Sequence, residues 1–297
     1  MKRKICLLLT LATILTCSTS CGKKQQVDES ITESIQNEST DIEEILGSDE
    51  DSSQVKEISV EEGIKLYNSA FDKAFSLDNY TITKNTSTTV NIKEKGEYTT
   101  VEKNQLMLSK EDFHFITDSL ITLPDDTTRK NDSCRLWYQN GIYYQNIIMP
   151  GSDELYFKEA VDHDIQLKNL QNIIIGESEE GENFNKFIAN ASVRSVDGQS
   201  HILFELEHKE LSSYLKSEYA NEENKDNIEI SDAQIDMQLD SDGTLKKTTS
   251  VIKMITGNFS LYRTETITLT DVGTTETPVL IASEKEKYID VSEEKTE

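Results

Sequence analysis

The chain has 297 residues, of which 55 are acidic and 30 are basic, so its formal net charge at pH 7 is −25. This acidity argues against binding to nucleic acid, because proteins neutralise phosphates with Lys and Arg. It also argues against attachment to an anionic lipid surface through basic residues.

The first residues predict a bacterial lipoprotein that is exported and anchored by a lipid. Three basic residues precede an apolar run over residues 5–15, which is too short to span a membrane, since about 20 residues are needed. Small residues 18–20 then stand before Cys21, as in a lipobox. We expect acyl chains such as palmitate on Cys21 to hold the protein at the extracytoplasmic face of the cell membrane. Cys17 is the alternative anchor, and an ordinary signal peptide with incidental cysteines is the alternative interpretation.

Composition divides the chain into four segments. Residues 1–20 form the signal peptide, 21–58 an acidic tether, 59–283 one folded domain and 284–297 a charged tail. The tether has no aromatic residue up to about position 56, so it cannot bury enough apolar surface to offset the entropy of ordering. Cys134 is the one cysteine outside the signal region, and we expect a buried, inert thiol there.

A helix is predicted at the start of the domain, over residues 61–77. Ser59 is a suitable N-cap, and Glu62 follows three residues later as in a capping box. Apolar residues, among them Tyr67, Phe71 and Phe75, recur at helical spacing and indicate one buried face. Such a stripe is more typical of a core than of a cofactor site.

Residues 80–145 predict an antiparallel meander. They are rich in Thr, Tyr, Val and Ile, with breaks at Gly96, at residues 124–126 and at residues 131–132. The strongest turn is Asn140-Gly141, which stands between two aromatic runs. It predicts a type I′ hairpin, because both positions of that turn need a positive φ.

The second half of the domain predicts more helices and then more strands. Apolar spacing favours one helix around residues 167–174 and a second from Phe184 to Ile188. A turn at 195–199, a strand at 201–207 and a helix at 209–220 follow. Three strands close the domain, at 228–239, 245–255 and 261–269, with a bulge near Ser231 and a turn at 240–243. The pattern predicts an α+β fold whose helices cover the apolar face of an antiparallel sheet.

This order of elements resembles the LolA/LppX-type lipoprotein superfamily. The matching features are the lipobox and tether, a first helix running directly into a strand, the Asn140-Gly141 hairpin, the paired middle helices, the strand–Asp-Gly–strand unit through Gly243, and residues 270–273 near the end. The resemblance implies a curved half-barrel with helices packed on its concave face. It assigns no ligand-binding residue, because the superfamily's cavity is defined by its apolar character.

No catalytic, cofactor or metal site is predicted. The chain has no His-Glu-x-x-His pair, no Gly-x-Ser-x-Gly elbow and no phosphate loop. Asp240, Asp242 and Gly243 hint at a calcium loop but lack the later Glu, so a plain turn is favoured. Asp125 and Asp126 are expected to be solvated. The four histidines, His114, His163, His201 and His208, are scattered. His201 and His208 flank the end of a strand, and solvated rings are favoured over a metal site there.

Two functions remain. The first is a non-enzymatic protein that binds or carries a hydrophobic, lipid-like ligand on the concave face. The alternative is an envelope protein-interaction, sensing or scaffold module with a filled core; no constellation supports a hydrolase. The expected partners are the membrane, through the anchor, and a hydrophobic small molecule or an envelope protein. Close packing of Phe71, Phe75, Ile173 and Phe187 against the sheet would favour the alternative.

Overall fold

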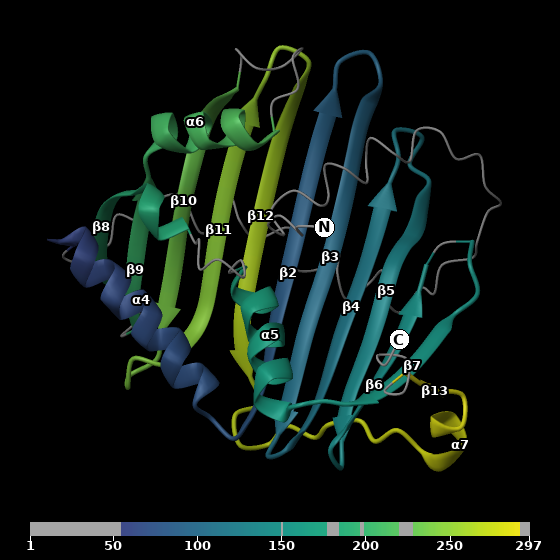
Figure 1. The fold of residues 1–297 in the computed structure, drawn as a ribbon. Helices are drawn as coiled ribbons and strands as arrows, with labels where there is room; N and C mark the ends of the chain where they lie inside the picture. Colours follow the sequence, from purple (N-terminus) through teal and green to yellow (C-terminus); the bar gives the residue numbers. More distant parts are fainter. Residues whose placement is uncertain (1–54, 150, 177–183, 197–198, 220–227, 292–297) are drawn as a thin grey trace.

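The structure, a computed structural model, describes residues 55–149, 151–176, 184–196, 199–219 and 228–291. These residues form one open sheet of 13 strands with a few helices (Figure 1). The strand order is β1-β8-β9-β10-β11-β12-β2-β3-β4-β5-β6-β7-β13, and neighbouring strands are antiparallel except β7 and β13. The expected antiparallel sheet is confirmed.

The strands are long in the middle of the sheet and short at its two edges. Their bounds are β1 Lys56–Ile58, β2 Asn79–Ile92, β3 Gly96–Ser109, β4 Asp112–Thr122, β5 Thr128–Gln139, β6 Ile142–Ile148, β7 Leu155–Ala160, β8 Ile188–Val196, β9 Gln199–Leu206, β10 Glu229–Leu239, β11 Leu245–Ile255, β12 Phe259–Thr270 and β13 Ile289–Asp290. The helices are α4 Val60–Phe75, α5 His163–Ile175, α6 His208–Tyr219 and α7 Ala282–Lys285, with a 3-10 turn η2 at Phe184–Phe187.

Local signals in the sequence explain where several elements begin and end. The Ser59 side chain accepts a hydrogen bond of 3.1 Å from the Glu62 amide, which caps α4 as expected. Asn140 and Gly141 have φ values of 53° and 79°, and they join β5 to β6 as the predicted type I′ turn. The bulge near Ser231 is also present, as a register shift between Ile230 and Asp232.

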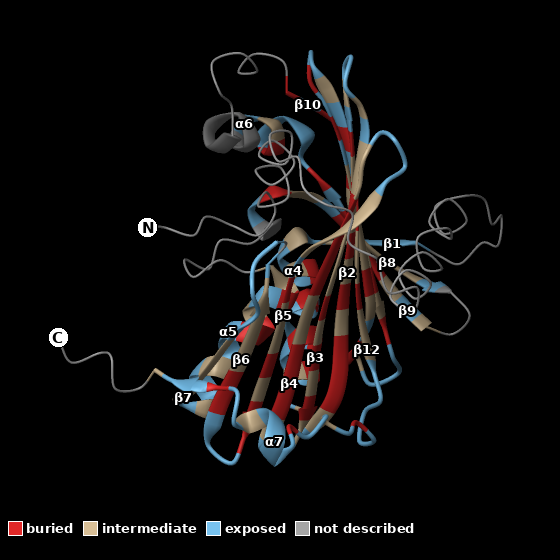
Figure 2. Ribbon diagram, turned by 90° about the vertical axis from the view of Figure 1, so that its right-hand side faces the viewer, coloured by how far each residue is buried: buried red, intermediate tan, exposed pale blue. Residues whose placement is uncertain are grey.

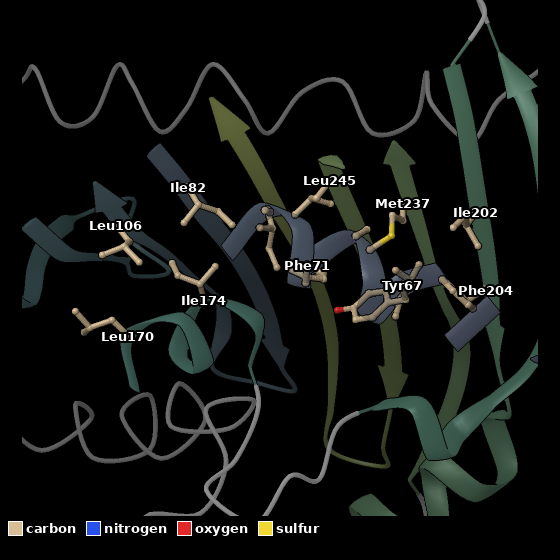
Figure 3. Close-up of a cluster of buried hydrophobic side chains, with 14 of the residues drawn as sticks. Tyr67, Phe71, Ile82, Leu106, Leu170, Ile174, Ile202, Phe204, Met237 and Leu245 are labelled. Atoms are coloured by element: carbon tan, nitrogen blue, oxygen red, sulfur yellow. The ribbon is translucent and has the colours of Figure 1, made fainter. Parts of the chain in front are cut away.

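The three long helices lie on the same side of the sheet, which we call the helix-bearing face; the opposite side is the outer face (Figures 1 and 2). Tyr67 and Phe71 of α4 point toward Met237 and Leu245 on the strands (Figure 3). Leu170 and Ile174 of α5 point toward Ile82 and Leu106 in the same way. These contacts join the helices and the sheet in one core.

Two predictions about the elements were wrong. Phe184 and Phe187 lie in the short turn η2 rather than in a second middle helix, and Ile188 begins strand β8. Here the spacing of three apolar residues imitates a helix, whereas Ala191 and Val193 continue the alternation of a strand. Residues 131–132 do not break the chain either. They lie inside β5, where the register with β4 shifts between Asp118 and Leu120.

The fold extends beyond the limits of 59 and 283 that composition suggests. Lys56–Ile58 pairs with β8, and β13 pairs with β7. Tyr288 is buried on the outer face against Tyr144 and Leu280. Residues 1–54, including the signal region and Cys21, lie outside the described residues. In the described part of the chain, no helix has the length and apolar character needed to cross a membrane.

Candidate ligand-binding face

The helix-bearing face is apolar at the end of the sheet that α5 covers. This lower apolar zone contains Tyr80 and Ile82 of β2, opposite Leu108 and Leu106 of β3. The Tyr80 hydroxyl accepts a hydrogen bond of 3.1 Å from Gln171 of α5, and burial raises the pKa of Tyr80 to about 12. The phenol therefore stays neutral, and α5 is fixed over the zone.

A band of polar residues crosses the middle of the same face. Cross-strand pairing places these residues side by side in three rows on β12, β2 and β3. We call them the polar band: Arg263, Glu265, Lys84, Thr86, Thr88, Thr100, Glu102 and Asn104. Figure 1 shows β2 and β3 continuing past the upper end of α5 at this level. The band therefore begins where the helix cover ends.

An ion network lies at one side of the polar band. Lys84 is buried and its Nζ lies 3.3 Å from Glu265 Oε2, while Arg263 donates to the same oxygen at 3.0 Å. Lys84 also donates to the Ile173 carbonyl near the C-terminal end of α5 at 3.3 Å, where the helix dipole favours a cation. Burial of Glu265 acts to raise its pKa, but Lys84 and Arg263 outweigh it and hold that pKa below the usual value.

A second apolar zone lies above the polar band. Val90 of β2 is opposite Leu261 of β12 on one side and Tyr98 of β3 on the other, and Ile121 of β4 is opposite Thr100. Val90, Leu261 and Ile121 are buried, whereas Tyr98 is only half-buried. No described helix stands in front of this part of β2 to β4 in Figure 1. We call it the upper apolar zone: Ile92, Val90, Tyr98, Ile121, Phe259 and Leu261.

Close packing of four residues against the sheet would favour a filled core, and only some of them are buried. Phe71 and Phe187 are buried in the core, and Phe75 packs against it. Ile173 is exposed on the far side of α5. Three of the four residues thus pack in the core, which favours a filled core for the part of the face under the helices, while no described helix stands in front of the upper zone on β2 to β4 (Figure 1).

The remaining candidate residues do not form a reactive site. Cys134 is half-buried, and burial raises the pKa of its thiol, which keeps the weakly nucleophilic protonated form. His201 Nδ1 lies 3.1 Å from Asp236 on the outer face, and His208 is exposed. His114 is buried on the outer face. Among the described residues no group of three potential metal ligands occurs.

The Asp240–Gly243 segment is a turn, as predicted. Asp240 Oδ1 accepts hydrogen bonds from the amides of Asp242 and Thr244, and Asp242 Oδ1 accepts from Thr244 at 2.8 Å. Gly243 has a φ of 82°, which suits glycine. Asp125 likewise accepts from the Thr127 amide in an exposed turn. These carboxylates therefore serve local backbone structure.

The polar band was not predicted from the sequence. Counting by two from Tyr80 and Ile82 places Lys84, Thr86 and Thr88 on the inward face of the strand. An inward lysine is unusual enough to have been a signal, because charged side chains are rarely buried without a partner. Its partner Glu265 lies 181 positions along the chain, so the network itself follows only from the strand order.

A scan against protein-family models and a search of curated proteins found no match. Solved structures do match. LprF from Mycobacterium bovis is 11% identical with a TM-score of 0.32, and the match covers 75% of this chain and 97% of that one. Lipovitellin, in a structure of its lipid–protein interactions, is 10% identical with a TM-score of 0.34, covering 70% and 27%. A LolA superfamily protein from Nitrosomonas europaea is 9% identical with a TM-score of 0.19, covering 74% and 96%.

These solved structures, among them a LolA superfamily protein, are only diffusely similar to this chain. The resemblance drawn from the order of elements therefore stays a prediction. At these identities and TM-scores, no ligand, partner or activity of the matched proteins is carried over to this chain.

Proposed function

We propose that this chain is a lipid-anchored protein of the extracytoplasmic membrane face whose sheet binds a hydrophobic, lipid-like ligand without catalysis. The observation that supports binding is the upper apolar zone. Its side chains are apolar on four neighbouring strands, β12, β2, β3 and β4, and α5 does not extend over it (Figure 1). An apolar ligand laid on this zone would gain about 25 cal/mol per Å² of buried apolar surface, before ordering costs.

One observation favours a small hydrophobic ligand over a core that is filled along the whole face. Leu170 and Ile174 of α5 are buried against the lower apolar zone, so that part of the face is filled and needs nothing further (Figure 3). Ile92, Tyr98 and Phe259 are by contrast only partly buried, although they stand on the same face. The upper zone therefore keeps apolar surface at these three residues, while Val90, Ile121 and Leu261 are already buried.

The chemistry of the described residues supports a binding role. Lys84 and Arg263 both pair with the Glu265 carboxylate, and burial raises the pKa of the Cys134 thiol. An activated nucleophile would need the opposite shift or an adjacent base. The residues brought together on this face are therefore suited to holding a molecule rather than to transforming it.

The binding proposal can be tested with Tyr98→Asn, which places a polar group in the upper apolar zone at a half-buried position. We expect the affinity of the purified full chain, freed of lipid on a hydrophobic resin, for the fluorescent probe diphenylhexatriene to fall about tenfold. Val101→Asn is the matched control, because Val101 lies on β3 but on the outer face. It should leave the affinity unchanged.

Circular dichroism would first establish that both variants fold. Equal weakening by Tyr98→Asn and Val101→Asn would show that the probe does not use the upper zone. Failure of the unaltered chain to bind the probe or any extracted lipid would contradict the proposed function and favour an interaction module.

A further inference from the structure

Two buried threonine hydroxyls in the polar band have no hydrogen-bond partner among the described residues. Thr88 of β2 and Thr100 of β3 are directly opposite each other and are 1% and 3% exposed. The Oγ1 atom of each finds no partner in the described part of the chain. Thr88 is two residues from Val90, and Thr100 is opposite Ile121, so both hydroxyls border the upper apolar zone.

The next pair of threonines on the same two strands behaves differently. Thr89 and Thr99 face the outer side, and their hydroxyl oxygens lie 3.2 Å apart in a hydrogen bond. The unpaired state of Thr88 and Thr100 is therefore no general property of facing threonines on these strands. Valine has nearly the same shape and would avoid a buried, unpaired hydroxyl, which lowers stability. Threonine at both positions indicates that the hydroxyls bond to something outside this pair.

The charges nearby indicate what kind of group that is. Lys84 and Arg263 carry two positive charges in the polar band, and Glu265 and Glu102 carry two negative charges. The band therefore has no formal net charge with which to select an anion, and the chain as a whole is strongly acidic. Hydroxyl groups both donate and accept hydrogen bonds, so they suit an uncharged head group with hydroxyl and ester oxygens.

We infer that the ligand is an amphiphile with an uncharged hydrogen-bonding head group, such as an acylglycerol. Its head bonds to Thr88 and Thr100, while its acyl chain lies on the upper apolar zone. This inference rests on the proposed function and makes it more specific. The inference predicts tighter binding of acylglycerols than of free fatty acids. The carboxylate of a fatty acid would find no net positive charge in the polar band, and the protein as a whole is acidic.

The test compares the double variant Thr88→Val/Thr100→Val with the control Thr89→Val/Thr99→Val on the outer face. The ligands are monooleoylglycerol, oleate and diphenylhexatriene, measured on the purified full chain. We expect the unaltered chain to bind monooleoylglycerol at least tenfold more tightly than oleate. The inner double variant should lose about tenfold for monooleoylglycerol, since two hydrogen bonds are removed, and keep its affinity for the headless probe.

A second measurement separates a role in binding from a role in folding. Removing unpaired hydroxyls should raise the melting temperature of the ligand-free chain by about 2–4 °C, while the outer control should not raise it. Unchanged monooleoylglycerol affinity in the inner variant, or equal affinity for oleate and monooleoylglycerol in the unaltered chain, would overturn the inference. If either result is found and diphenylhexatriene still binds, the proposed function stands and only the inference about the head group fails. If no ligand binds at all, the proposed function fails as well.

Discussion

His114 shows how one buried side chain couples this fold to pH. The ring lies on the outer face, stacked on Trp137 with 4.7 Å between the ring centroids, and neither of its nitrogens has a hydrogen-bond partner among the residues that the structure describes. Burial, together with the nearby charge of Arg135, lowers the pKa of His114 to about 4. The folded protein therefore favours the neutral ring, whereas the unfolded chain binds a proton near pH 6.5.

The sign of the effect on stability follows from that difference. The contribution of neutral His114 is complete above pH 6.5 and is lost as the pH falls toward 4. We expect the free energy of unfolding to drop by about 2 kcal/mol between pH 7 and pH 5 through this residue alone. His114→Phe keeps a ring against Trp137 and should flatten the curve in this range. Urea denaturation at both pH values would measure it, and parallel curves for the two proteins would contradict the assignment.

The position of α4 depends on a glycine in its first turn. A Cβ atom on Gly63 would lie 2.8 Å from the Ala191 side chain and 2.9 Å from that of Phe204. The helix therefore approaches β8 and β9 as closely as it does because this residue has no side chain. Its neighbour Tyr67 packs its ring 6.0 Å from the Phe204 ring, edge to face.

Gly63→Ala should therefore destabilise the fold, although alanine is the better helix former. Helix propensity favours alanine by about 1 kcal/mol, but overpacking against two strands costs about 1–3 kcal/mol. We expect a lower melting temperature, measured by differential scanning calorimetry. Asn68→Ala, at an exposed position of the same helix, is the control and should raise stability slightly. A stabilised Gly63→Ala protein would show that α4 can move away from the sheet without loss.

The elements that the sequence predicts best are those whose signals are local. The cap at Ser59, the Asn140-Gly141 turn and the alternation in β10 each depend on residues close together in the chain. The strand β8 was mistaken for a helix because η2 and the start of β8 share three apolar residues at helical spacing. Burial of Tyr288 on the outer face depends on contacts with Tyr144, which no local pattern reveals.

The candidate site was predicted in general character and not in detail. An apolar face covered by helices follows from periodicity, and the core of Phe71, Leu170 and Ile174 agrees with it. The polar band does not follow, because the Thr-rich run in β2 reads simply as strand propensity. The residues of the band come together only because β2 pairs with β12, which lies near the other end of the domain in the sequence.

At the scale of the whole molecule, the proposed anchor on Cys21 would hold the sheet at the end of a tether. The first strand begins at Lys56, and residues 22–55 can span at most about 120 Å when fully extended. The chain has a formal net charge of −25, so an anionic lipid surface would not attract it electrostatically. Acyl chains would therefore have to supply the attachment, at about 0.8 kcal/mol for each buried methylene group, and two or three chains give a stable anchor.

We predict that these chains are carried by Cys21. Cys21→Ser should move the protein from the membrane fraction to the soluble fraction of the producing bacterium and abolish labelling by a clickable palmitate analogue. Cys17→Ser is the control within the same signal region and should leave both properties unchanged, because small residues 18–20 favour cleavage before Cys21. Labelling that survives Cys21→Ser and disappears in Cys17→Ser would move the anchor to Cys17. A chain that is never labelled would leave an ordinary signal peptide as the explanation of this region, and the sheet would then have to reach its ligand without a lipid anchor.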